Sequence, residues 1–311
     1  MRRTASSSSP RLGSLTIMPV DVSSETVKLS LGASSVEVAL KGATVISYVH
    51  DGRERLFVSS KSDIRTSDET AIRGGVPLCW PVFGPPPSDN ALYNKLKQHG
   101  FARTSVWEVA DQQDSQDGVK VVFKLSPTEA IKSVFKLPFA LTYTVDLRPY
   151  SLLLTLHVEN PSPAVAALPF QTALHTYFRL PQGVTPPDVS VTGLENLAYN
   201  DKVSGEQKVT ERRKEVVVDG PNGEVDRVYF RAPNEMVMRF KGQAETVKVT
   251  KSGFADAVVW NPGPKKGSTI ADMEEGGYDR YVCLEGCQVE PFVYLDPGKD
   301  WTGTYEVSFS Q

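Results

Sequence analysis

Four histidines limit where this chain can transfer protons near neutral pH, because histidine is the side chain whose ordinary pKa lies closest to that range. His50 stands at a turn signal and His157 lies inside a strand-like run, so both are expected to be structural. His99 belongs to a loop, residues 98–103, in which a glycine permits close backbone approach. His175 has apolar and aromatic neighbours that would lower the pKa of its imidazolium by desolvation. On composition alone, a buried structural histidine is the simpler interpretation of His175.

Carboxylates that interrupt apolar sequence are the second set of candidates. Glu285 closes the apolar stretch 281–284, and glutamate rarely occurs in such surroundings without a partner. It is either a strand-end carboxylate in water or a general base whose pKa is tuned by partial burial. Glu290 offers a second carboxylate just downstream. Asp226 is a weaker candidate, because a turn or an ion pair with Arg227 would explain it.

Residues 73–84 form an unusual run, in which two glycines follow an arginine and two prolines flank a tryptophan. The glycines do not indicate a phosphate-binding loop, because no lysine-serine pair and no helical segment follows them. A rigid connection that packs Trp80 and Phe83 into the core, with Arg73 in solvent, is the simplest interpretation.

The charge of the chain limits its partners. A net charge of -3 and a pI of about 5.9 give no basic field for nucleic acid or for anionic lipid. We therefore expect neither a nucleic acid nor a membrane partner. An anionic small molecule would have to be held by a few placed cations, which makes individual arginines worth following.

The cysteines and the hydropathy of the chain indicate the cellular compartment and whether a metal site is expected. Cys79, Cys283 and Cys287 are odd in number and lack paired C-x-x-C spacing, which argues against a disulfide scaffold and against a zinc site. No apolar run approaches the ~20 residues needed to span a bilayer. These features favour a reducing compartment, and we expect a cytoplasmic protein.

Residues 1–19 are expected to form a flexible tail. The first acidic residue is Asp21, and the preceding sequence is basic and rich in serine, a composition that an organelle transit segment shares. A disordered tail is the preferred interpretation and a transit segment is the alternative. A chain that begins at Met18 is expected to fold and to be active.

From Val27 onward the chain reads as short alternating or β-branched runs separated by turn clusters, which is typical of strands. The clearest are residues 27–31, 36–40, 119–125, 141–147, 152–158, 215–218, 236–240, 247–250 and 304–309. The pattern predicts an all-β sandwich in a single domain over residues 20–311. One short helix is expected to open with Ser126 as its cap and to end near Phe135.

In their order along the chain, these segments resemble the hexose-6-phosphate mutarotases, also called glucose-6-phosphate 1-epimerases, of the aldose 1-epimerase superfamily. The resemblance covers roughly residues 27–308 and rests on residues 73–78, 98–103 with Trp107, 174–178, 226–229, 232–235, 258–262, 283–285 and 295–298. Each motif is moderately specific, whereas their shared order is strong. The resemblance implies a large antiparallel β-sandwich of the galactose mutarotase-like supersandwich type, with the active site in a cleft on one concave face.

The resemblance also implies roles for individual residues. His175 would be the general acid and Glu285 the general base, and His99 and Asp226 would hold the sugar. Arg73 and Arg103, with His99 nearby, would bind the 6-phosphate. Glu285 is preferred to Glu290 because its cysteine-apolar-glutamate context matches the family position.

The sequence departs from the family pattern at two places. Gly263 stands where the family usually has a large aromatic residue, and the segment ending at Met273 replaces a form that carries phenylalanine. We therefore expect the local shape of the cleft to differ from that of its relatives.

The chemistry implied is mutarotation, in which a hexose ring opens, rotates about the bond between C1 and C2, and closes on its other face. One base and one acid suffice, so no cofactor and no metal is expected, and the partner is a small-molecule sugar phosphate. We expect a monomer. The alternatives are a mutarotase for non-phosphorylated aldoses, a non-catalytic sugar-phosphate-binding module, and a plain β-sandwich interaction domain.

Overall fold

The computed structural model describes residues 19–115 and 117–310, so nearly all of the expected tail, residues 1–19, lies outside the described part. Strands form three sheets, and the pairings between named strands are antiparallel. The five-stranded sheet runs in the order β1 (Val20–Val22), β2 (Thr26–Leu31), β3 (Ser34–Ala39), β4 (Thr44–His50), β5 (Arg53–Glu54).

The two larger sheets mix segments that are far apart in the sequence. The nine-stranded sheet has the order β16 (Glu215–Val217), β13 (Val189–Thr192), β18 (Glu235–Phe240), β19 (Thr246–Ser252), β22 (Asp300–Ser310), β10 (Ser151–Glu159), β9 (Ala140–Leu147), β8 (Gly118–Leu125), β7 (Glu108–Ser115). The eight-stranded sheet has the order β15 (Val209–Thr210), β14 (Ala198–Asp201), β17 (Val225–Tyr229), β20 (Asp256–Asn261), β21 (Tyr281–Leu295), β11 (Leu168–Leu174), β6 (Leu78–Cys79), and β12 (Tyr177–Arg179) also pairs with β21.

Helices are few and short in the part of the chain that the structure describes. They are α1 (Glu129–Val134) and α2 (Gly263–Gly267), with single 3₁₀ turns η1 (Ala102–Thr104), η2 (Pro186–Asp188), η3 (Pro221–Gly223) and η4 (Gly277–Arg280). Within residues 19–115 and 117–310, no helix is long and apolar enough to cross a membrane.

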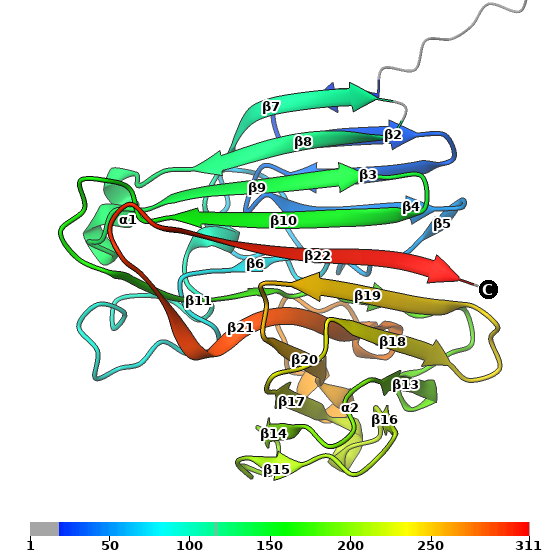
Figure 1. Cartoon of the computed structure of the whole chain (residues 1–311). Helices are drawn as coiled ribbons and strands as arrows, with labels where there is room; N and C mark the ends of the chain where they lie inside the picture. The colour runs from blue at the N-terminus through cyan, green and yellow to red at the C-terminus, as the bar shows by residue number, and fades with distance from the viewer. Residues whose placement is uncertain (1–18, 116, 311) are drawn as a thin grey trace, which may run out of the picture.

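The sheets form a sandwich, as the sequence predicted. The nine-stranded sheet extends from β7 to β16, and the other two sheets lie against one of its faces (Figure 1). Strands β2 and β3 pack on β8 and β9, and β21 packs on β22. One apolar core contains side chains from all three sheets, for example Val38, Val145 and Leu284.

Strands of the nine-stranded sheet show the alternation that made them predictable. In β9 the side chains of Leu141, Tyr143, Val145 and Leu147 are buried in the core, while the residues between them are partly exposed. Burial of such a side chain stabilises the fold by about 1.5–3 kcal/mol. Each of the nine segments expected to be strands overlaps an observed strand.

The central strands of the eight-stranded sheet behave differently, because β20 and the first half of β21 are buried on both faces. On β21, Val282 and Leu284 point into the main core, and Tyr281 and Cys283 point into a second apolar cluster. That cluster covers the outer face of the sheet. The candidate site lies against this second apolar cluster.

The expected helix forms, but its cap differs from the prediction. Helix α1 ends at Val134, next to the expected Phe135, and Thr128 rather than Ser126 is its N-terminal cap. The Thr128 hydroxyl accepts a hydrogen bond from the Ile131 N–H at 3.2 Å. Thr128 has an extended backbone, so the helix begins at Glu129, two residues later than a cap at Ser126 would place it.

Two glycines join the five-stranded sheet to the eight-stranded sheet immediately after Arg73. Gly75 has a φ of +68°, and a Cβ there would lie 2.1 Å from the carbonyl oxygen of Val45. Its N–H donates to the carbonyl of Phe57 at 2.7 Å. Only glycine allows two backbones to approach so closely at a positive φ, and this contact fixes the position of Arg73.

We expect Gly75→Ala to lower the free energy of unfolding by about 3 kcal/mol or more, because both backbone strain and a clash with Val45 must be accommodated. Gly205→Ala is the matched control. Gly205 also has a positive φ, +81°, but no atom lies within 4 Å of the added Cβ. It should lose only the ~1–2 kcal/mol of the left-handed conformation. Equal losses in urea unfolding would show that the backbone contact at Gly75 is unimportant.

Candidate active site

Strand register places two of the predicted site residues, Asp226 and Glu285, on one face of the eight-stranded sheet. Asp226 of β17 pairs with Trp260 of β20, which pairs with Cys283 of β21, which pairs with Tyr177 of β12. Directly paired residues point to the same face of a sheet, so these four side chains form a row. Glu285 lies two residues beyond Cys283 on the same face.

His175 and Glu285 meet at the centre of this face. His175 Nδ1 lies 3.3 Å from Glu285 Oε1, with 10% of the His175 side chain and 1% of the Glu285 side chain exposed. The two groups are close without being aligned as a hydrogen bond, and neither Glu285 oxygen bonds to any residue that the structure describes. Burying a carboxyl group without a hydrogen-bond partner costs stability, so its presence here indicates that a ligand interacts with it.

The position of His175 is fixed by stacking and by its backbone. Its ring stacks on Tyr177, with centroids 4.8 Å apart and planes at 15°, and meets the edge of Trp260 at 5.4 Å. Its N–H donates to the carbonyl of Pro77 at 3.0 Å. The imidazole is therefore held toward Glu285 without help from a polar side chain.

Burial shifts both members of the pair away from their charged forms. It raises the pKa of Glu285 well above the ordinary glutamate value, although the charge of Lys202 opposes this shift. Burial also lowers the pKa of His175 well below the ordinary histidine value, with the charges of Arg103 and Arg73 acting in the same direction. The pair is therefore expected to hold one proton over a broad pH range.

His99 lies beside the pair, with its ring centroid 5.8 Å from that of His175. Its backbone has a φ of +65°, and its N–H donates to the carbonyl of Gly84 at 2.9 Å. The N–H of Gly84 in turn donates to His99 Nδ1 at 3.2 Å. Burial lowers the pKa of His99 well below its ordinary value, so its ring is neutral. Because Nδ1 accepts from Gly84, the ring proton is on Nε2, which lies 3.3 Å from the side-chain nitrogen of Gln98.

Arg73 precedes the two glycines that join the sheets, and its side chain reaches the same face of the eight-stranded sheet. Its Nε donates to Asp272 Oδ1 at 3.1 Å and its Nη1 to the Tyr177 hydroxyl at 3.4 Å. Tyr177 thus connects Arg73 to the stacked His175. The guanidinium is oriented in advance, although a carboxylate already compensates part of its charge.

Arg103 lies in the turn η1 and differs from Arg73 in its partners. Its Nη2 donates to the carbonyl of Gln98 at 2.9 Å, and its Nε is buried without a partner in the described part of the chain. No carboxylate forms an ion pair with it among residues 19–115 and 117–310. Arg103 is therefore a fixed cation with an unused donor.

Asp226 lies at the far end of the row, next to Lys202. Lys202 Nζ is 3.8 Å from Asp226 Oδ1 and 4.6 Å from the centroid of the Phe83 ring. Arg227 is not the partner of Asp226, because it pairs with Asp201 at 2.9 Å on the opposite face. Burial raises the pKa of Asp226, and the charge of Lys202 opposes this.

The site includes three residues that the sequence analysis did not identify, namely Tyr177, Lys202 and Asp272. Tyr177 had a usable signal, since it follows His175 by two residues in a segment of alternating side chains. Lys202 and Asp272 had none. Their proximity to Asp226 and Arg73 depends on how distant segments of the chain pack.

The remaining candidates lie away from the pair. His50 ends β4 and stacks on Phe309 at 5.3 Å, and His157 lies in β10 beside Thr302, so both have the structural positions that were expected. Glu290 is exposed and lies 3.8 Å from Lys208. It does not reach His175, which leaves Glu285 as the carboxylate of the pair.

The two departures from the family pattern lie at the border of this face. Gly263 begins α2 with a φ of +61°, and a Cβ there would lie 2.7 Å from the backbone of Gly223, so a larger residue cannot occupy this backbone position. Met273 is buried in the second apolar cluster near Phe57. Both residues therefore influence the walls of the site rather than its acid-base pair.

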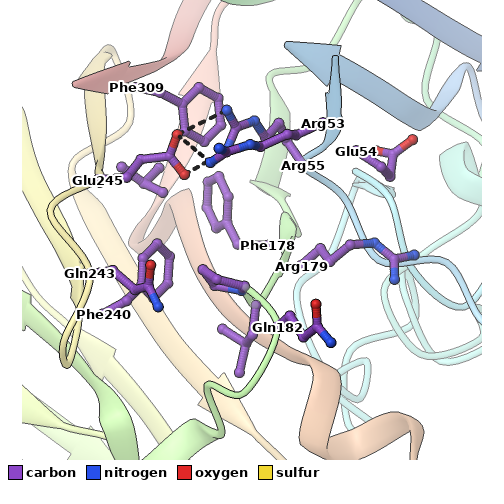
Figure 2. Close-up of a pocket in the computed structure, with 13 residues that line it drawn as sticks. Arg53, Glu54, Arg55, Phe178, Arg179, Gln182, Phe240, Gln243, Glu245 and Phe309 are labelled. Atoms are coloured by element: carbon purple, nitrogen blue, oxygen red, sulfur yellow. Dashed lines mark hydrogen bonds and ion pairs between the residues drawn. The ribbon is translucent and has the colours of Figure 1, made fainter. Parts of the chain in front are cut away.

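A separate pocket of about 410 Å³ contains none of the predicted site residues. Figure 2 shows Arg53, Arg55, Phe178 and Phe309 around it, with Glu245 at its edge. The Arg55 guanidinium donates to both Glu245 oxygens, at 2.7 and 3.0 Å. The charge of this buried arginine is therefore compensated within the protein. The unpaired polar groups that indicate chemistry are at His175 and Glu285.

Comparison with known proteins gives the family. The aldose 1-epimerase family matches residues 25–308. A Cenchrus ciliaris protein named as a candidate glucose-6-phosphate 1-epimerase is 33% identical over 280 residues, covering 88% of this chain and 80% of the relative. An Escherichia coli protein of the same name is 31% identical over 253 residues, with 79% and 77% covered. The crystal structure of a candidate mutarotase from Salmonella typhimurium has the same fold, with a TM-score of 0.81, 24% identity, and 94% and 93% covered. The chain therefore belongs to the aldose 1-epimerase family.

Proposed function

We propose that this protein is an isomerase that interconverts the α and β anomers of a hexose 6-phosphate, with glucose 6-phosphate as the expected substrate. The observation that carries the proposal is the buried His175–Glu285 pair, whose facing atoms lie 3.3 Å apart and have no hydrogen-bond partner in the described structure. The names of the two relatives support the same substrate class. A cytoplasmic location and a monomeric state remain predictions.

Glu285 and His175 would exchange protons with the sugar in a balanced cycle. The Glu285 carboxylate takes the proton of the C1 hydroxyl, the His175 imidazolium gives a proton to the ring oxygen, and the bond from C1 to that oxygen breaks. The products are an open-chain aldehyde, a carboxylic acid and a neutral imidazole. After rotation about the bond between C1 and C2, the same transfers run in reverse.

The charged side chains around the pair would hold the rest of the substrate. Arg73 and Arg103 are the cations proposed for the 6-phosphate, because the planar guanidinium can donate to two phosphate oxygens and keeps its charge. His99 Nε2 can add a neutral donor. Asp226, with Lys202, is proposed to bind sugar hydroxyl groups.

A mutarotase for non-phosphorylated aldoses is the second candidate. It is favoured by the ion pair of Arg73 with Asp272, which reduces the charge available for phosphate. A non-catalytic sugar-phosphate-binding module is less favoured. Binding alone would not require an unpaired carboxyl group beneath the sugar, where its desolvation is costly.

The first prediction concerns the general base. Glu285→Gln should keep the fold and slow the equilibration of pure α-glucose 6-phosphate by roughly 10²–10⁴-fold, because the amide cannot accept the C1 proton. The anomer ratio is followed by NMR, and circular dichroism checks the fold. Glu290→Gln is the matched control, since it changes an exposed carboxylate on the same strand and should leave the rate unchanged. Equal rates for Glu285→Gln and the wild type would remove Glu285 from the mechanism.

The second prediction concerns the phosphate. Arg103→Ala, and likewise Arg73→Ala, should lower kcat/KM for hexose 6-phosphate by roughly 10- to 150-fold, because a hydrogen bond to a charged group contributes about 1.5–3 kcal/mol. Free hexose should lose little. Arg53→Ala changes an arginine that is 68% exposed and should affect neither substrate. Equal losses on both substrates would mean that these arginines do not bind the phosphate.

The third prediction concerns pH. The wild-type profile of kcat/KM should be bell-shaped, falling at low pH when the pair gains a second proton and at high pH when it loses its only one. Lys202 lowers the pKa of both Glu285 and His175. Lys202→Met should therefore move both limbs of the profile to higher pH. Lys202→Arg keeps the positive charge and should leave both limbs at their wild-type positions.

Lys208→Met removes an exposed lysine and serves as the control, for which the wild-type profile is expected. A profile that is flat from roughly pH 5 to 9 in the wild type would argue against an acid-base pair. Limbs that stay in place in Lys202→Met would show that this lysine does not act on the pair.

A further inference from the structure

Three side chains that bind transition metals meet within the candidate site. One donor atom each from His175, Cys283 and Glu285 lies within 4.8 Å of the other two, and all three residues are buried. The His175 and Glu285 donors are 3.3 Å apart. Ligand atoms around a tetrahedral zinc ion, with bonds of about 2.0–2.3 Å, are about 3.3–3.8 Å apart. Small side-chain rotations would therefore bring the three donors to binding distance.

The strands fix this arrangement before any ion arrives. Cys283 and Glu285 are two residues apart on β21, so both point to the same face of the sheet. His175 faces them from the connection between β11 and β12, with its backbone bonded to Pro77. The cysteine spacing in the sequence gave no indication of a metal site, because the donors come from two distant segments.

The donor atoms are not engaged elsewhere. Cys283 is a free thiol, and His175 Nδ1 and both Glu285 oxygens make no hydrogen bond within the described part of the chain. A divalent ion bound to a thiolate, a carboxylate and a neutral imidazole forms a complex with no net charge. Such a complex avoids most of the cost of burying an isolated ion.

We propose that His175, Cys283 and Glu285 bind Zn²⁺ reversibly and that the bound ion inhibits anomerisation. Binding forms three ligand bonds and releases the thiol proton and the proton of the pair to solvent, with no change in oxidation state. Imidazole and thiolate ligands favour Zn²⁺ over Mg²⁺ or Ca²⁺. The nearby cations Arg73, Arg103 and Lys202 oppose the ion, so the affinity should be moderate and chelators should remove it.

Inhibition follows from the proposed function, because the ion would occupy both the general base and the general acid. Binding itself does not depend on that function. The two can therefore be tested separately, and failure of one is distinguishable from failure of the other.

Binding is measured first, on the full chain without substrate. Isothermal titration calorimetry with Zn²⁺ should show one site per chain, and Co²⁺ should give a near-ultraviolet thiolate-to-cobalt absorption band. In Cys283→Ala the band should disappear and the affinity should fall by more than the roughly 10- to 100-fold typical of losing an outer-sphere partner. Cys79→Ala changes another buried cysteine, one that is not among the three donors, and should behave as the wild type.

Inhibition is measured second, with each variant compared with its own rate in a chelator. Zn²⁺ should slow anomerisation of α-glucose 6-phosphate by the wild type, excess chelator should restore it, and Mg²⁺ should have no effect. Cys283→Ala should need a much higher Zn²⁺ concentration. A thiolate-to-cobalt band that persists in Cys283→Ala, or the absence of Zn²⁺ binding to the wild type, would overturn the proposed site. Binding without inhibition would overturn the inhibitory role alone.

Discussion

A carboxyl group and an imidazole buried against each other constrain the architecture of this protein. Glu285 lies in the middle of the eight-stranded sheet beside His175 and has no hydrogen-bond partner in the described chain, and both groups lose the water that would stabilise their charges. Their neighbours must therefore be rigid. Stacking on Tyr177, the edge of Trp260 and the backbone contact with Pro77 hold His175 without offering Glu285 a competing hydrogen bond.

This requirement explains why β20 and β21 are buried on both faces. One face packs into the sandwich core, and the other carries the second apolar cluster, which includes Cys79, Cys283 and Met273. The main core stabilises the sheet, as in any sandwich. The second cluster excludes water from beneath the candidate site and keeps the local dielectric low, which strengthens every interaction with a bound anion or proton.

The sequence predicted long strands in which one face is buried and the other is not, such as β9, although it missed the short alternating strands β13 and β14. It did not predict β20 or the full length of β21, because strands buried on both faces show no alternation. The sandwich was identified correctly from the pattern of short strands and the family from ordered motifs, and the structure brings His175 and Glu285 into contact. The neighbours Lys202 and Asp272 could not be predicted, since each meets its partner only through packing between segments that are distant in the sequence.

The protonation of the pair connects burial to the proposed reaction. In the proposed reaction the pair must be charged, as carboxylate and imidazolium, before the ring opens, and it is neutral, with the same number of protons, once the ring is open. Burial disfavours the charged state, so it favours proton transfer toward the open-chain state but makes the charged starting pair less populated. Lys202 acts in the opposite direction on Glu285, by stabilising the carboxylate that must accept the first proton. Arg103, Arg73 and Lys202 also lower the pKa of His175 and so oppose the imidazolium. The match between the closed and open states would therefore depend on burial and on all three cations.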